Sequence, residues 1–365
     1  MTKTDVSRGS DTVRVLFTPF YEENPYQEMY EEALQSEEIV VCRHKDPIPF
    51  SPLSLRAILN QVDVIHLHWL HPFFLFGSKR WFYDVPGSKV ISILAAAFFI
   101  LQIYLLSLTS IKIIWTVHNI TNHENRYLKI DRWVNNSVAK YVDYVQAWDD
   151  TTEKAIQTRF NIPSARIVKI PHGNYTPRYN DRGSVSKEIP LDVSSFSRVF
   201  FHFGMVRPYK NVPQLIQTFD EVASDEDCLL IAGNPIDDVM RMNVEQAASD
   251  CDNVLLDLRY IPDEEVPSYF ERADVCVFPY EDIFNSGSVL LAMTFGKPVI
   301  APKKGSIPSV LHDKNYLYED LENALIKASC TDTADLEVIG AENKRASVRN
   351  HNWEDIAIQT KRIYE

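Results

Sequence analysis

Two cations that follow an apolar run in the second half of the chain have the types and spacing of an anion site. Arg207 and Lys210 follow the run Val199–Phe203, with Gly204 at the turn, and a predicted helix begins near Val212. Cations beside a helix N-terminus bind anions, because the first backbone N–H groups and the helix dipole also attract negative charge. The loop is therefore suited to a diphosphate, and a pair of solvated surface cations is the alternative interpretation.

A second polar segment in the same half precedes an apolar helix that we expect over 288–295. It contains Asn285, Ser286, Gly287 and Ser288. Asn and Ser are preferred N-caps, and the free N–H groups of a first turn can also hold a phosphate oxygen. A capped core helix would explain the caps but not Gly287, since alanine favours a helix by about 0.5–1 kcal/mol over glycine. We therefore interpret Gly287 as allowing the close approach of a ligand.

Histidines at the ends of predicted strands are the other candidates for chemistry. His118 ends the run Lys112–Val117, and His66 and His68 alternate on an earlier strand, so these two share one face. A zinc pair would need further ligands, so we predict no metal and interpret His68 as lining a cleft; a purely structural role is the alternative. The candidate acceptor contacts, all near the ends of predicted strands, are Asn24, Tyr26, His68, Trp69 and His172.

Apolar runs alternate with helix-like stretches along the whole chain, which predicts parallel sheets covered by helices on both faces. The 365 residues are enough for two such domains. Doubly wound domains bind ligands at the carboxyl ends of their strands, where the candidate residues lie. We expect strands near 13–20, 39–42, 63–67, 112–117, 144–147, 166–170, 199–203, 228–232, 253–256, 274–278 and 298–301.

A polar stretch rich in Pro, Gly and Ser, from Thr176 to Ser197, separates the two domains. Neither domain has G-x-G-x-x-G after its first strand, which disfavours a dinucleotide-dependent oxidoreductase. We predict a flexible tail over 1–10, an N-terminal Rossmann-like domain over 11–178, a linker over 179–197, a C-terminal Rossmann-like domain over 198–348 and a last helix in 349–365.

The composition is that of an ordinary globular protein. A net charge of −13 disfavours a nucleic-acid-binding protein. The five cysteines include no C-x-x-C pair, which indicates reduced thiols in a cytosolic protein.

The run 91–108 is apolar nearly all round and almost long enough to span a membrane. It lies between two strands that we expect in one sheet, and these cannot lie on opposite sides of a membrane, so it is predicted to be a crossover helix. Lys79, Arg80, Trp81, Phe82 and Tyr83 precede it, a mixture typical of a headgroup interface. We predict peripheral attachment to the cytoplasmic membrane face through 79–108; burial under a neighbouring subunit or loop is the alternative.

Several motifs together resemble the C-terminal domain of glycosyltransferase family 4 and its GT-B relatives. They are Arg207 with Lys210, Leu229–Pro235, Asn253–Tyr280, Ala292–Pro302 and the last stretch, Arg349–Tyr364. The resemblance implies two Rossmann-like domains that face a central cleft, with the last helix crossing back to the N-terminal domain.

By this resemblance the chain is a Leloir-type, metal-independent hexosyltransferase. The co-substrate is a UDP- or GDP-linked sugar, no other cofactor is needed, and the acceptor is a hydroxyl of a lipid-linked glycan. His118, Arg207 and Lys210 are the implied catalytic residues. The implied donor-binding residues are Gly204, Arg207, Lys210, Asn234, Tyr260, Glu281, Asn285, Ser286, Gly287 and Ser288.

The chain departs from this family at two positions. The family carries glutamates where this sequence has Ile283 and Leu291; Glu281 or Asp282 could substitute. A retaining enzyme could use the diphosphate as base, whereas an inverting enzyme needs a side chain such as His118 or Glu124. Two other functions stay open: a non-catalytic partner subunit of a glycosyltransferase complex, favoured by the missing glutamates, and a nucleotide-sugar epimerase.

Overall fold

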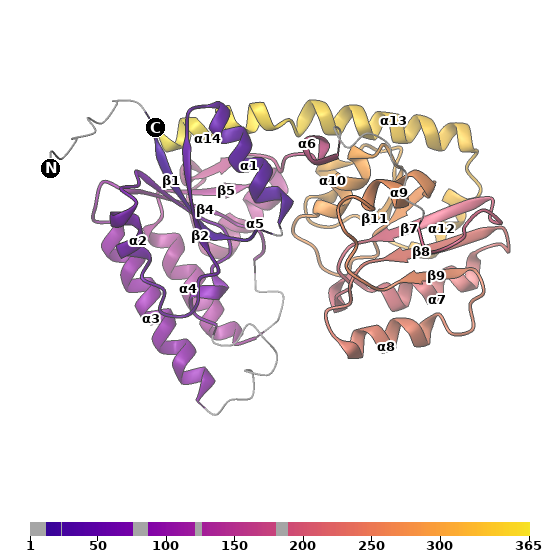
Figure 1. The fold of residues 1–365 in the computed structure, drawn as a ribbon, viewed down its shortest axis with the longest axis horizontal. Helices are drawn as coiled ribbons and strands as arrows, with labels where there is room; N and C mark the ends of the chain where they lie inside the picture. Colours follow the sequence, from indigo (N-terminus) through magenta and orange to yellow (C-terminus); the bar gives the residue numbers. More distant parts are fainter. Residues whose placement is uncertain (1–11, 23, 76–86, 121–125, 180–188) are drawn as a thin grey trace, which may run out of the picture. The chain divides into compact units, whose positions relative to one another are not determined.

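A computed structural model of the chain describes residues 12–22, 24–75, 87–120, 126–179 and 189–365 (Figure 1). The predicted tail 1–10, the candidate base Glu124 and residues 79–86 of the predicted membrane contact lie outside the described residues. The chain forms two compact units: unit 1 contains 1–171 and 353–365, and unit 2 contains 172–352.

Unit 1 is built on a parallel sheet whose strand order is β2-β1-β3-β4-β5-β6. Both faces of this sheet are covered, because consecutive residues of β1 such as Val15, Leu16 and Phe17 are all buried. The strands are β1 (Arg14–Phe20), β2 (Val40–Lys45), β3 (Val64–Leu67), β4 (Lys112–Thr116), β5 (Tyr144–Ala147) and β6 (Ile167–Lys169).

The last helix of the chain packs in unit 1, beside the first helix (Figure 1). Tyr30 and Thr360 share a hydrogen bond of 2.6 Å, and Tyr364 Oη lies 2.5 Å from His66 Nδ1. The helices of unit 1 are α1 (Pro25–Ser36), α2 (Leu53–Leu59), α3 (Ser88–Leu106), α4 (Leu128–Tyr141), α5 (Asp150–Phe160), α14 (Trp353–Tyr364) and the 3-10 turns η1 (His71–Phe73) and η3 (Ser164–Arg166).

Unit 2 has a second parallel sheet, ordered β12-β11-β10-β7-β8-β9. Its strands are β7 (Arg198–Phe203), β8 (Asp227–Ala232), β9 (Val254–Asp257), β10 (Val275–Val277), β11 (Val299–Pro302) and β12 (Tyr316–Tyr318). Its helices are α6 (Thr176–Tyr179), η4 (Pro208–Lys210), α7 (Val212–Val222), α8 (Asp238–Ala247), α9 (Val266–Arg272), α10 (Gly287–Thr294), α11 (Ile307–Val310), α12 (Leu321–Ser329) and α13 (Thr333–Asn350).

Two hydrophobic cores fill the faces of the second sheet. Along β7, Phe201 packs with α9 and α10, whereas its neighbour Phe200 packs with α7 and α12. Side chains alternate between the two faces of a strand, so a strand that buries consecutive apolar residues has to be covered on both sides. The predicted fold class, two doubly wound α/β domains, is confirmed.

The chain passes from unit 1 to unit 2 between Pro171 and His172, before the linker that the sequence predicts over 179–197. Tyr175, Tyr179, Ile189 and Leu191 pack against the core of unit 2. These few apolar side chains, set in a polar stretch, explain why the described part of the predicted linker belongs to that unit. Residues 180–188 lie outside the described part of the chain.

Helix α3 connects β3 to β4, which pair directly in parallel, so it is a crossover helix. Of the described helices it is the one long and apolar enough to cross a membrane, with a mean hydropathy of 2.2. One face, including Phe99 and Ile103, is fully buried on unit 1. The other face leaves large apolar side chains exposed: Val90, Ile93, Leu94, Phe98, Leu101, Tyr104 and Leu105.

Candidate functional site

Each sheet has a topological switch point, where the outgoing connections of two neighbouring strands run to opposite sides. In unit 2 this point lies between β7 and β10, and in unit 1 between β1 and β3. Ligands of doubly wound sheets bind in the crevice outside such a point. Candidate residues follow each of these four strands, so both sheets place part of the predicted set where binding is expected. The others follow neighbouring strands: His118 after β4, His172 after β6, Asn234 after β8 and Tyr260 after β9.

Lys210 is the central charge at the switch point of unit 2. It ends η4, is 8% exposed, and forms no ion pair with any residue of the described chain. Its Nζ lies 5.7 Å from the centre of the Tyr280 ring. Burial and the neighbouring charge of Arg207 lower the pKa of Lys210 to about 7. A buried cation without a counter-ion is unfavourable, so this position is prepared for an anionic ligand.

Gly204, Lys210 and Ser288 converge on one point, although they come from three segments. Gly204 has φ +120, and a Cβ there would lie 3.0 Å from Lys210 Nζ and 3.2 Å from Ser288 Oγ. A side chain at position 204 would therefore be strained by its backbone and would also fill the space beside the ammonium. The structure thus brings together the two predicted segments, the cationic loop and the start of α10.

The polar residues before α10 are engaged in holding the helix start. Ser286 is the N-cap: its Oγ accepts from Val289 N at 3.2 Å and donates to Tyr280 Oη at 3.3 Å. Asn285 Oδ1 accepts from Ser286 N at 2.9 Å and from Ser306 Oγ at 3.2 Å. These side chains fix the first turn of α10, whose remaining N–H groups supply positive potential at the site.

The structure gives Gly287 an internal role. A Cβ at this position would lie 2.6 Å from the hydroxyl oxygen of Tyr175. Tyr175 is packed against the core of unit 2, and its backbone N donates to Thr294 Oγ1 at 3.1 Å. A protein contact therefore also accounts for glycine at 287, and the close approach of a ligand, expected from the sequence, stays a prediction.

The other predicted donor residues lie around this centre with exposed side chains. Glu281 N donates to Tyr209 O at 2.9 Å, and Asn234 O accepts from Val206 N at 2.9 Å, so both backbones support the cationic loop. Arg207 is half-buried beside Met205. Tyr260 follows β9, two strands away from β7, and is 64% exposed.

At the two positions where the resemblance would place glutamates, this chain has apolar side chains that pack in the core of unit 2. Leu291 is buried within the core cluster between α9 and α10, and Ile283 packs against the same cluster. Glu281 and Asp282 are exposed.

The structure adds His202, which the sequence analysis did not select. This residue lies on β7, fully buried; its Nδ1 donates to Val277 O at 2.8 Å, and its Nε2 has no partner among the described residues. Burial and the charge of Lys210 lower its pKa to about 3. The sequence could have indicated a role for His202 because it lies two residues before Gly204. A histidine inside an apolar strand, however, is usually structural.

At the switch point of unit 1, His68 and His118 form a hydrogen-bonded pair. His68 Nδ1 lies 3.1 Å from His118 Nε2, and His68 Nε2 has no partner among the described residues. The pKa of His68 is held well below its ordinary value by burial, with His66 and His118 adding to the effect. His68 is therefore neutral at physiological pH, and its hydrogen bond with His118 is made by an uncharged imidazole.

Aromatic rings fix the orientation of His118. Trp69 stacks on its ring with centroids 4.1 Å apart, and Tyr26 and Trp148 lie 5.6 and 5.3 Å away. Such rings stabilise a cation at their faces, so an imidazolium at His118 would be favoured here. Tyr26, His68 and Trp69 are thus brought together, as predicted for acceptor contacts.

The remaining candidate residues make structural hydrogen bonds, and one of them belongs to unit 2. His66 is fully buried and hydrogen-bonded to Tyr364 and, at 2.6 Å, to Thr116. His172 belongs to unit 2, where its carbonyl accepts from His351 Nδ1, so the structure does not group it with Trp69. Asn24, the fifth predicted acceptor contact, caps α1 through Tyr26 N. No group of three or more His, Cys, Asp or Glu able to hold a metal occurs in the described ranges.

Comparisons with known proteins agree with this arrangement. Residues 197–335 match the model of the family described as glycosyl transferases group 1. The chain superposes on a sucrose-phosphate synthase from Thermosynechococcus elongatus with a TM-score of 0.73 and 16% identity, over 97% of this chain and 98% of the other. It also superposes on Anabaena HepE, solved in complex with UDP-glucose, with a TM-score of 0.68 and 14% identity, over 96% of this chain and 98% of the other.

The fold is that of GT-B glycosyltransferases, and the C-terminal domain matches the group 1 family model over 197–335. Among curated relatives, the chain is 27% identical over 282 residues to a GDP-mannose:glycolipid 4-beta-D-mannosyltransferase of Xanthomonas campestris, covering 76% of this chain and 72% of the relative. It is 26% identical over 234 residues to O-antigen chain mannosyltransferase B of Escherichia coli, covering 59% and 58%.

The contact between Gly287 and Tyr175 can be tested by a pair of substitutions. Gly287→Ala is expected to lower the free energy of unfolding by about 1–3 kcal/mol, the usual cost of overpacking. Tyr175→Phe removes the opposing oxygen, so the double variant should recover most of this loss in urea unfolding. A Gly287→Ala protein of unchanged stability with weakened donor binding would instead support the ligand interpretation.

Proposed function

We propose that this chain transfers a mannosyl group from GDP-mannose to a hydroxyl of a glycolipid at a membrane surface. The observation that carries the proposal is the buried, uncompensated Lys210 at the switch point of unit 2, which converges with Gly204 and Ser288. The choice of mannose, GDP and a glycolipid follows the curated relative from Xanthomonas campestris. The donor to be tested is therefore GDP-mannose, and the acceptor is a glycolipid.

Unit 2 would bind the donor and stabilise the leaving group. As the glycosidic bond breaks, negative charge develops on the departing diphosphate. Lys210, Arg207 and the N–H groups at the start of α10 are aimed at that charge, which is the kind of preorganised stabilisation that lowers a barrier most effectively. These groups supply the positive charge that a divalent ion would otherwise provide, so we expect transfer without a metal.

In unit 1, His118 would act as the general base. Mannose is α-linked in GDP-mannose, so a β-linked product requires inversion and a side chain that removes the proton of the attacking hydroxyl. When His118 Nε2–H donates to His68 Nδ1, His118 Nδ1 would be the atom that takes up that proton. His68 then selects the reactive tautomer of His118, and the surrounding rings stabilise the imidazolium that forms.

The pH dependence of donor binding tests the role of Lys210. Its pKa is lowered to about 7, so below this pH the free protein already carries the charge that the diphosphate needs. Above it, binding has to take up a proton, and the Kd of GDP-mannose should rise about tenfold or more from pH 6.5 to 8.5. Calorimetric titration should show this rise in the wild type, and Lys210→Arg, which stays charged, should remove it.

The same titration has a matched control and a clear negative outcome. Arg207→Ala/Lys210→Ala should abolish binding, whereas Lys314→Ala, which removes an exposed lysine paired with Glu342, should not change it. UDP-sugars are expected to bind more weakly than GDP-mannose. If no nucleotide sugar binds the wild type, the donor site is wrong and a non-catalytic partner subunit becomes the better interpretation.

His118 is tested by separating binding from transfer. His118→Gln should bind GDP-mannose with the wild-type affinity but transfer the sugar about 100-fold or more slowly, the usual contribution of a general base. Rates of transfer measured at saturating donor give this comparison directly. Equal rates in variant and wild type would assign the base to another group.

Attachment to the membrane would use the exposed face of α3. The neighbouring segment extends the apolar surface, since Phe50 lies 6.0 Å from Phe98 between ring centroids and Ile58 on α2 is also exposed. An apolar face of a helix that is left exposed in this way is typical of a contact with the membrane interface.

Vesicle flotation measures this contact. Leu94→Gln/Leu101→Gln should release the protein from vesicles and leave its melting temperature within a few degrees of the wild type, because both side chains are exposed. The control Val338→Gln/Val348→Gln changes two exposed side chains of α13 in unit 2 and should leave vesicle binding intact. Retention of the α3 variant on vesicles would contradict attachment through this helix.

A further inference from the structure

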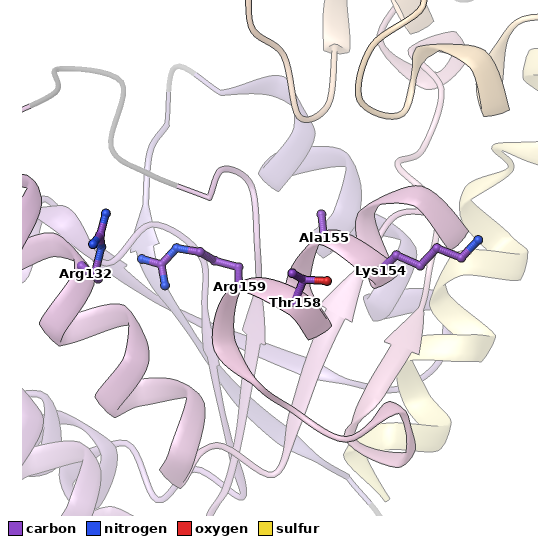
Figure 2. Close-up of a pocket in the computed structure, with 5 residues that line it drawn as sticks. All are labelled: Arg132, Lys154, Ala155, Thr158 and Arg159. Atoms are coloured by element: carbon purple, nitrogen blue, oxygen red, sulfur yellow. The ribbon is translucent and has the colours of Figure 1, made fainter.

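A groove on unit 1 gathers positive charge from residues that have no assigned role in donor binding or beside His118. It has a volume of about 600 Å³ and lies along α4 and α5 (Figure 2). Arg132 comes from α4, and the other four lining residues come from α5. The lining residues are Arg132, Lys154, Ala155, Thr158 and Arg159.

Arg159 is held so that part of its guanidinium is left without a partner. Its Nη1 donates to Asn136 Oδ1 at 2.9 Å, and its Cζ lies 5.0 Å from the centre of the Phe160 ring. Its Nη2 is buried and has no hydrogen-bond partner among the described residues. A buried donor without a partner is unfavourable, so a ligand that accepts from Nη2 would remove this penalty.

Positive charge is in excess around the groove. Arg132, Lys154 and Arg159 form no ion pair within the part of the chain that the structure describes. The carboxylate whose charge favours the Arg159 cation, Asp131, is 3% exposed and accepts from Asn135 Nδ2. Asp150, near Lys154, is paired with Lys169 at 2.5 Å. Burial and the charge of Arg132 both lower the pKa of Arg159.

We propose that this groove is a second anion site, which binds a phosphate group between Arg132 and Arg159. The two guanidinium groups offer planar sets of donors that match phosphate oxygens. Figure 2 shows the guanidinium of Arg159 pointing toward Arg132, whereas Lys154 extends away from both, so Lys154 adds positive potential at the other end of the groove.

The phosphate could be carried by a lipid or be free in solution. Helix α4 lies between the groove and the apolar face of α3, since it packs against both α3 and α5. On α4 itself, Leu128 and Trp133 are also exposed apolar side chains. Phosphate on a lipid headgroup or on a lipid-linked glycan would therefore reach the groove while its chains contact α3; this source rests on the proposed function, whereas free phosphate does not.

The test uses the full chain with Lys210→Ala in the background, so that phosphate at the donor site does not contribute. Arg132→Gln/Lys154→Gln removes two charges from the groove, and Lys129→Gln/Lys140→Gln removes two exposed charges from α4 outside it. Calorimetry with inorganic phosphate and flotation with vesicles of phosphatidylcholine, with or without phosphatidic acid, provide the two arms.

We expect the groove variant to bind at least fivefold more weakly than the background protein in one or both arms, and the control variant to bind within twofold. Loss in the vesicle arm identifies a lipid phosphate, and loss with inorganic phosphate alone identifies a free one. Equal loss in both variants, or no binding by the background protein in either arm, would overturn the proposal. GDP-mannose titration of the groove variant with Lys210 restored reports on the donor site separately.

Discussion

A buried ammonium group with no counter-ion is the constraint on which the rest of unit 2 depends. Lys210 can be kept there because Gly204 leaves room beside it, because Tyr280 offers an aromatic face, and because α10 begins at the same point. Burial of the ammonium is unfavourable in the free protein. Gly204, Tyr280 and the start of α10 therefore describe a site whose missing negative charge is that of the ligand.

The candidate site of unit 1 depends on orientation more than on charge. His68 is buried and neutral, and it contacts the ring of His118, which Trp69 holds by stacking. The last helix belongs to the same unit, and its Tyr364 hydrogen-bonds His66 beneath this pair. The end of the chain therefore supports a polar network that a sheet of apolar strands would not stabilise alone.

The strands and the two-domain fold could be predicted from the sequence because buried parallel strands are continuous apolar runs, as in Phe200–Phe201 and Leu229–Ile231. The cationic loop could be predicted because cations between a strand and a helix lie where parallel sheets bind anions. The contact of Gly287 with the Tyr175 hydroxyl could not be predicted, since Tyr175 comes from a distant part of the sequence. The His68–His118 pair and the contact of Trp148 with His118 also depend on neighbouring strands, which spacing along one strand does not reveal.

The most direct test of the central claim is transfer itself. Purified protein is incubated with radiolabelled GDP-mannose, a bacterial glycolipid fraction and EDTA, and the label in the extracted lipid is measured and its anomeric configuration determined. The account predicts a β-linked mannolipid, formed in the presence of EDTA and lost with Lys210→Ala. A protein that binds GDP-mannose but places no label in any lipid would contradict it and would assign the chain a binding role within a larger complex.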